Sequence, residues 1–159
     1  MKKAIKVGLN FGLTSGVITT LGLMVGLNSG TNLKLAVVAG ILTIAIADAF
    51  SDALGIHMSK ESENVSTNKE VWAATISTFF FKFIFALSFL IPVLLFDLKT
   101  AIVIAIIWGM FLIILASYLI AKDTQKKPFH VIFEHLFISS VVIVIAHYLG
   151  VFINNVFLG

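Results

Sequence analysis

One segment is long and apolar enough to cross a bilayer, yet it carries two acids: it spans Leu33–Met58 and has the sequence LKLAVVAGILTIAIADAFSDALGIHM. About 20 mostly apolar residues suffice for a membrane-spanning helix. Asp48 and Asp52 lie inside this segment, where a carboxylate is costly unless it is paired, hydrated or protonated. Because a spacing of four puts both side chains on one helix face, we expect that face to handle an ion.

The composition indicates an integral membrane protein. Hydrophobic residues make up 59% of the 159 residues and charged residues only 12%, so lipid must cover most of the surface. The chain has no cysteine, which excludes disulfides and thiolate metal sites. The lysines at its start resemble a signal peptide, but the apolar run passes Leu27 without a clear small-residue cleavage site, so we expect a retained first span.

Five segments meet the length and polarity expected of membrane-spanning helices. They are Val7–Leu27, Leu33–Met58, Val71–Phe96, Thr100–Ala121 and Val131–Phe157. The connections between them are short, and none has room for a soluble domain. The sequence therefore predicts an all-α integral membrane protein, with one five-helix transmembrane domain over residues 1–159. We expect it in the cell membrane of a prokaryote.

The lysines predict the orientation of the bundle. If the N-terminus is cytoplasmic, most lysines lie in inner segments. The inner set is Lys2, Lys3, Lys6, Lys60, Lys69, Lys122, Lys126 and Lys127, and the outer set is Lys34 and Lys99. The net charge of +3 is thus a feature of topology and not a nucleic-acid-binding patch. After five spans the C-terminus lies outside, and Lys82 is left over in the middle of the third span.

The first span carries two series of glycines at intervals of four. They are Gly8, Gly12 and Gly16, followed by Gly22, Gly26 and Gly30. Small residues at this spacing let another helix approach closely. Two interpretations stay open: ordinary packing inside the bundle, or a homodimer formed through the first helix.

Asp48 and Lys82 are expected at the same depth. At about 1.5 Å of rise per residue, Asp48 lies roughly 15 Å and Lys82 roughly 16 Å from the inner ends of their spans. One interpretation is a buried ion pair that locks the bundle, in which loss of either partner leaves an uncompensated charge. The other is that Asp48 and Asp52 coordinate a cation and exchange protons, since two acids against one lysine leave an excess negative charge.

Further polar residues in the inner half are candidates for the metal site or for proton coupling. They are Asn10, Thr14, Met58, Glu61, Glu63 and Glu134. The first two offer neutral oxygens on one face of the first span, and the methionine offers a thioether, which favours softer metals such as Fe(II). The two loop glutamates would concentrate cations at the mouth of the site. The last glutamate is assigned to proton coupling or ion pairing together with Asp48 and Lys82.

Three stretches, in order over nearly the whole chain, resemble the vacuolar iron transporter family of iron and manganese membrane transporters. Residues 11–20 (FGLTSGVITT) resemble the first helix of that family, residues 49–63 (AFSDALGIHMSKESE) its second helix, and residues 89–94 (FLIPVL) the Ile-Pro turn of its third. The resemblance implies a homodimer that exports Fe(II) or Mn(II) from the cytoplasm against protons, through a path lined by the first two helices.

Three features depart from the pattern of that family. The acid of its first helix is missing near Asn10 and Phe11, and a methionine of its second helix falls at Asp52. Its cytoplasmic metal-binding domain is reduced here to about a dozen residues. A site built from oxygen ligands would accept Mn(II) as readily as Fe(II).

We therefore expect a divalent metal transporter in which Asp48 and Asp52 bind the ion and Lys82 tunes Asp48 or stands in for the ion. The expected partners are the lipid bilayer, a second copy and the transported metal, with no tightly bound cofactor and no nucleic acid. The alternative is a non-transporting membrane module held by an Asp–Lys lock. An enzyme is not expected, because no nucleophile with a base and no metal-hydrolase spacing is present.

Overall fold

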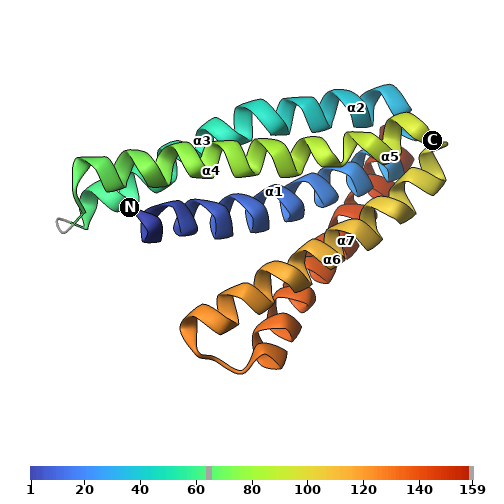
Figure 1. The fold of residues 1–159 in the computed structure, drawn as a ribbon. Coiled ribbons are helices and arrows are strands. Elements are labelled where there is room, and N and C mark those ends of the chain that lie inside the picture. Colours follow the sequence, from blue (N-terminus) through green and yellow to red (C-terminus); the bar gives the residue numbers. More distant parts are fainter. Residues whose placement is uncertain (64–65, 158–159) are drawn as a thin grey trace.

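The computed structural model describes residues 1–63 and 66–157, and every regular element in these ranges is helical (Figure 1). The elements are α1 (Lys2–Thr31), α2 (Lys34–Thr43), the π-helical segment η1 (Ile44–Asp48), α3 (Ala49–Ser62), α4 (Asn68–Ser88), α5 (Leu90–Leu95), α6 (Leu98–Thr124) and α7 (Pro128–Phe157). They form five helices long and apolar enough to cross a membrane, because α2, η1 and α3 are continuous and α4 runs on into α5.

The five expected spans are thus confirmed, and each helix extends beyond the apolar stretch that predicted it. The first begins at Lys2 rather than Val7 and ends at Thr31 rather than Leu27. It stops there because Asn32 adopts a left-handed conformation, with φ 51°, and its N–H bonds back to a carbonyl of the last turn. Asparagine tolerates this conformation better than most residues. The thickness of the bilayer sets only the length of the apolar part of a helix. The helix can therefore continue through the terminal turns that carry lysines.

A break separates α4 from α5 at Phe89, three residues before Pro92. Proline has no N–H, and its ring clashes with the carbonyl four residues earlier. That carbonyl belongs to Ser88, the last residue of α4. Ser88 also accepts a hydrogen bond from Trp108 Nε1 at 3.1 Å, so a side chain of α6 supports the break.

Helix α1 packs against α2, α4, α6 and α7 and so lies at the centre of the bundle (Figure 1). Its first three glycines face α4: a Cβ on Gly12 would lie 2.7 Å from the Thr78 carbonyl oxygen, and one on Gly16 would lie 3.2 Å from that of Lys82. Contacts below 3 Å with backbone leave no room for a side chain. Glycine here allows the two helix backbones to meet.

The second glycine series of α1 faces α7. A Cβ on Gly22 would meet Val142 at 3.1 Å, and one on Gly30 would meet the backbone of Gly150 at 3.4 Å. Both series are therefore used for packing within one chain, which is the first of the two interpretations of these glycines. The glycine faces of helix 1 are covered by α4 and α7, and the homodimer through this helix stays a prediction.

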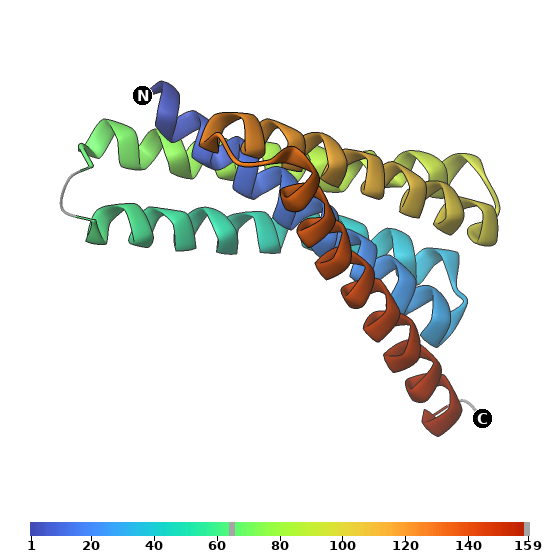
Figure 2. The same cartoon turned by 90° about the horizontal axis from the view of Figure 1, so that it is seen from below.

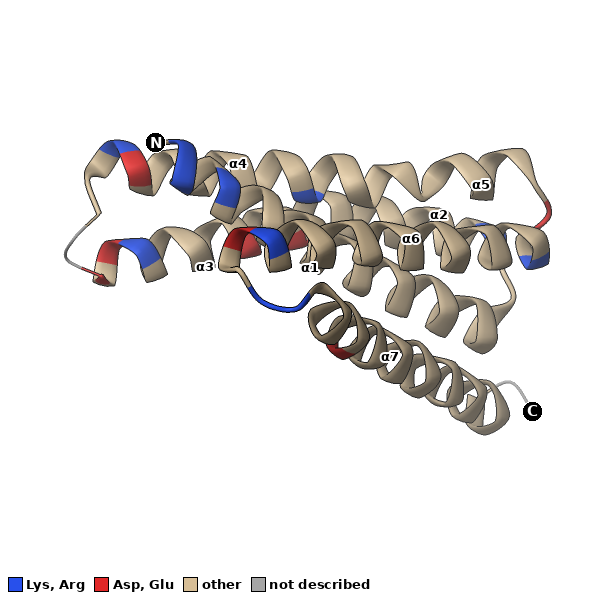
Figure 3. Cartoon of the chain, turned by 60° about the horizontal axis from the view of Figure 1, so that its bottom comes forward, with Lys and Arg blue, Asp and Glu red and all other residues tan. Residues whose placement is uncertain are grey.

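The two ends of the bundle differ in charge (Figure 3). The N-terminus, the α3–α4 connection and the α6–α7 connection lie at one end, with most of the lysines. Ion pairs tie this end together: the Met1 ammonium lies 3.2 Å from Glu70, and Lys6 lies 2.5 Å from Asp123. At the opposite end, Lys34 Nζ donates to the Phe96 carbonyl.

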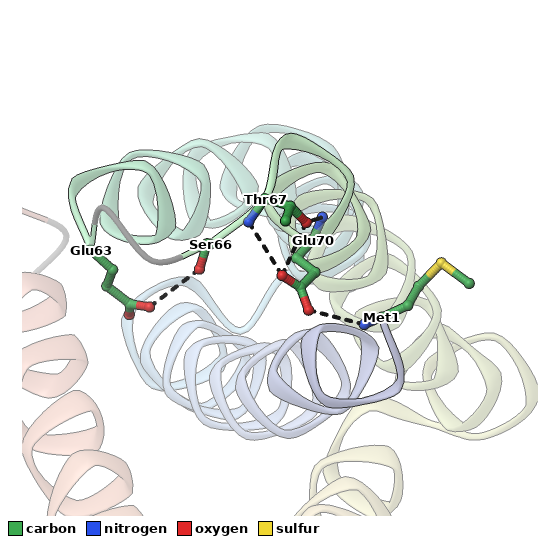
Figure 4. A network of polar contacts seen from close by, with 5 residues as sticks. All are labelled: Met1, Glu63, Ser66, Thr67 and Glu70. Atoms are coloured by element: carbon green, nitrogen blue, oxygen red, sulfur yellow. Dashed lines mark hydrogen bonds and ion pairs between the residues drawn. The ribbon is translucent and has the colours of Figure 1, made fainter.

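The start of α4 is fixed by a capping box at the lysine-rich end. Thr67 accepts the backbone N–H of Glu70, and the Glu70 carboxylate accepts the backbone N–H of Thr67 (Figure 4). The same network contains a contact of 3.5 Å between Ser66 and Glu63. Reciprocal capping satisfies two donors that the first turn leaves free, so α4 begins at Asn68.

Helix α7 leaves the bundle obliquely (Figure 2). Most of its residues in the described range are exposed. It crosses α1 and runs beside α6. Its buried residues in the described range are Val131, Ser139 and Gly150. The exposed face is apolar, with large side chains such as Phe152, which suits contact with lipid tails.

Candidate functional site

A buried lysine joins two aspartates at the meeting point of α1, α3 and α4. Lys82 Nζ lies 2.5 Å from Asp48 Oδ2 and 2.5 Å from Asp52 Oδ2, and it donates to Ser15 Oγ at 3.0 Å. Ser15 Oγ in turn donates to Asp52 Oδ2 at 2.6 Å. The expected ion pair between Asp48 and Lys82 is present, and Asp52 shares it. We call these four residues the Lys82 cluster.

Two features of the helices place these carboxylates beside the lysine. Asp48 is the last residue of η1 and Asp52 lies in the first turn of α3, so a spacing of four keeps both on the face toward α4. The π-helical segment that ends at Asp48 is wider than an α turn, and such turns are frequent at functional sites. The apolar sequence of Ile44–Ala47 shows no signal for it.

The lysine itself is placed by close contact between α1 and α4. Gly16 lets the backbone of α1 come near Lys82, and a Cβ at that position would lie 3.3 Å from Lys82 Cγ. The stem of Lys82 is thereby enclosed, and its side chain is 0% exposed. A bulkier residue at position 16 would push the ammonium out of line with the carboxylates.

Ser15 belongs to the site, whereas the sequence pattern predicts Asn10 and Thr14 as the neutral oxygen ligands. Thr14 Oγ1 donates to the Asn10 carbonyl of its own helix. In the described residues neither of them bonds to Asp48 or Asp52. A usable signal was present: Ser15 follows Gly12 by three positions, which puts it on the same face. The glycine series marks that face as the one that meets α4.

The cluster is unevenly exposed. Lys82 is fully buried, whereas the side chains of Asp48 and Asp52 are 32% and 19% exposed. Oδ2 of Asp48 is itself buried, and the ion pair with Lys82 supplies its polar contact. With both acids ionised and the lysine protonated, the formal charge of the cluster is −1. The carboxylates are thus the part of the cluster that an ion can reach first.

The other candidate ligands lie apart from the cluster, toward the lysine-rich end. Met58 is 62% exposed, and Glu61 and Glu63 are exposed as well. Glu63 pairs with Lys60 at 2.8 Å. Glu134, on α7, is exposed and has no hydrogen bond within residues 1–63 and 66–157. The structure therefore brings together Asp48, Asp52 and Lys82, and leaves the remaining candidates outside.

Three of the four histidines each contact one hydroxyl group within the described residues, among them His57 and His135. His57 Nδ1 lies 3.0 Å from Thr75 Oγ1, and His135 Nδ1 lies 2.9 Å from Ser117 Oγ. In the part of the chain that the structure describes, no three side chains of histidine, aspartate or glutamate come close enough to hold one metal ion.

Fold and site place the chain in the class of all-helical integral membrane proteins with a buried lysine–dicarboxylate cluster. Comparison with protein-family models, with curated proteins and with solved structures finds no match.

Proposed function

We propose that the chain is a membrane transporter that exports Fe(II) or Mn(II) in exchange for protons, with Asp48 and Asp52 as the ion ligands. The observation that supports the proposal is the shared pairing, in which one ammonium lies 2.5 Å from an oxygen of each carboxylate. Divalent cations of this kind are bound by carboxylate oxygens. Lys82 thus occupies, as a tethered cation, the position between two metal ligands.

Charge balance explains how such a site would couple metal to protons. The resting cluster carries −1, and a divalent ion between the carboxylates would raise the sum to +1 if the Lys82 ammonium remained. Like charges a few ångströms apart repel strongly where the dielectric constant is low. Release of one proton from Lys82 brings the sum to zero. Metal binding and proton release are therefore linked, as an exchange mechanism requires.

The exposure of the cluster supports a sequence in which the metal reaches the carboxylates first and Lys82 then releases its proton. A cation approaching from the exposed side of Asp48 meets the carboxylates before it meets the lysine, which is wholly buried. In the proposed exchange, release of the Lys82 proton leaves a neutral amine beside Ser15, whose Oγ lies 3.0 Å from Lys82 Nζ.

A structural lock is the second candidate, and one observation favours it. An ammonium has three N–H donors, and Lys82 Nζ contacts three acceptors, on Asp48, Asp52 and Ser15. An ammonium that hydrogen-bonds Asp52 and Ser15 and forms an ion pair with Asp48 fits a permanent tie between these helices as well as it fits a transport site. Transport measurements separate the two candidates.

The test is metal flux into vesicles that contain the purified protein, with a second dye reporting internal pH. We expect Mn(II) or Fe(II) flux with opposite proton movement in the wild type, and loss of both in Asp52→Asn, because the amide keeps the shape but lacks the charge. Asp123→Asn is the matched control, since it makes the same change at the Lys6 ion pair on the surface. Wild-type flux in Asp52→Asn, or no flux in any protein, contradicts the proposal.

A further inference from the structure

Ser15 is the residue that α1 contributes to the candidate site, and its hydroxyl bonds differently from three threonine hydroxyls of the same helix. Thr14, Thr19 and Thr31 each donate to the carbonyl four residues earlier in α1. Bonding of this kind is common for serine and threonine inside helices. Ser15 Oγ instead donates to Asp52 Oδ2 at 2.6 Å. The hydroxyl is therefore directed at the site and not at its own helix.

The Ser15 hydroxyl has bonding capacity left for a cation. A hydroxyl group has one proton to donate and two lone pairs that accept. The proton of Ser15 is donated to Asp52, and one lone pair accepts a hydrogen bond from Lys82 Nζ at 3.0 Å. Within residues 1–63 and 66–157 no other hydrogen bond reaches Ser15 Oγ. The second lone pair is thus available to a metal ion.

The distances place this lone pair beside the carboxylate ligands. Oxygen ligands lie about 2.0–2.6 Å from a bound divalent ion. Ser15 Oγ is 2.6 Å from Asp52 Oδ2, so both oxygens can contact the same ion. Lys82 Nζ already contacts these two oxygens and Asp48 Oδ2. Oxygens from α1, η1 and α3 therefore converge on one cation.

These three atoms form a set of oxygen ligands only, and this bears on the kind of ion that the set holds. Affinity generally rises from Mn(II) to Zn(II) at a given site, so the type of ligand decides how far softer ions displace Mn(II). Sulfur and imidazole ligands favour the softer ions, whereas oxygen suits Mn(II). Met58 lies apart from the cluster, and His57 contacts Thr75. A hydroxyl as the third ligand keeps the advantage of softer ions small.

We propose that Ser15 is the third ligand of the transported ion and determines its selectivity, holding Mn(II) in an oxygen-only set with Asp48 and Asp52. The inference rests on the proposed function, because it concerns the ion that the same site would carry. A neutral ligand adds affinity without altering the charge of the cluster. Selectivity can thus be changed at Ser15 while both carboxylates stay intact.

Replacing the Ser15 oxygen by sulfur tests the ligand directly. The chain has no cysteine, so Ser15→Cys introduces a single thiol. Cd(II) added to the purified full-length variant should give the ultraviolet charge-transfer band of a cadmium–thiolate bond, and excess Mn(II) should reduce that band by competition. Ser140→Cys is the matched control, because it makes the same change at an exposed position of α7. Mn(II) should not reduce any band in the control.

Flux into vesicles compares Mn(II) with Cd(II) in the same variants. In Ser15→Ala we expect the KM for Mn(II) to rise by about tenfold or more, the scale on which loss of a supporting group weakens metal sites. In Ser15→Cys the ratio of the KM for Mn(II) to the KM for Cd(II) should rise by about tenfold or more on the same scale. Ser15→Thr keeps a hydroxyl and should keep the wild-type ratio. A purely structural role of Ser15 would shift both KM values together and leave the ratio unchanged.

Failure of this inference can be told apart from failure of the proposed function. Mn(II) flux in the wild type, with the same KM values and ratio in Ser15→Ala and Ser15→Cys, overturns the role of Ser15 and leaves transport standing. A band in Ser15→Cys that Mn(II) does not reduce overturns it as well, because the thiol then lies outside the ion site. A band that Mn(II) does reduce, with no flux in the wild type, supports Ser15 as a ligand and contradicts transport.

Discussion

Replacing Lys82 by methionine removes the positive charge of the cluster and little else. Methionine keeps the stem that packs against Gly16, so the two carboxylates lose their partner without creating a large cavity. Loss of one partner of a buried ion pair costs about 3–5 kcal/mol. Because Asp48 and Asp52 remain 32% and 19% exposed, water screens part of this loss, and we expect a destabilisation near the lower end, about 3 kcal/mol.

Thermal unfolding in detergent, followed by circular dichroism and tryptophan fluorescence, measures this loss. For a chain of this size, about 3 kcal/mol corresponds to a fall of roughly 6–12 °C in Tm. Adding Asp48→Asn alone should restore only part of it, because Asp52 still lacks its cation. The triple variant with both aspartates changed to asparagine should recover most of the loss. A Tm equal to that of the wild type in Lys82→Met itself would refute the ion pairing.

Three further predictions follow from packing and capping. Gly12→Leu should prevent folding or lower Tm strongly, since its Cβ would meet backbone of α4 below 3 Å, whereas Gly55→Leu should leave Tm nearly unchanged, because no described atom lies within 4 Å of a Cβ there. Thr67→Ala should cost about 1 kcal/mol through loss of the cap of α4, measurable as faster amide exchange in its first turn. A hydrogen bond from the Thr100 N–H lowers the pKa of Asp97 below its ordinary value of 3.8. The cap on α6 should thus be fully effective above pH 3.8 and weaken only as the pH falls through that lower pKa, and Asp97→Asn should remove this dependence of amide exchange on pH.

Much of the fold follows from patterns along the chain. Five apolar stretches of the right length predict five helices, and the structure contains them, each longer than predicted at one end or both. Pro92 predicts the break after Ser88 because proline removes a donor and crowds a carbonyl. The match in depth between Asp48 and Lys82 follows from a constant rise per residue, and the ion pair is present.

Only the tertiary structure decided which helix faces pack against one another. The glycines of α1 predict close packing, but their partners could have been a second copy, and in the structure they are α4 and α7. Ser15 joins the Lys82 cluster and Thr14 does not, although both are polar neighbours in the first span. Periodicity states which residues share a face of one helix. It does not state which other helix that face will contact, because that choice depends on how all five helices fit together.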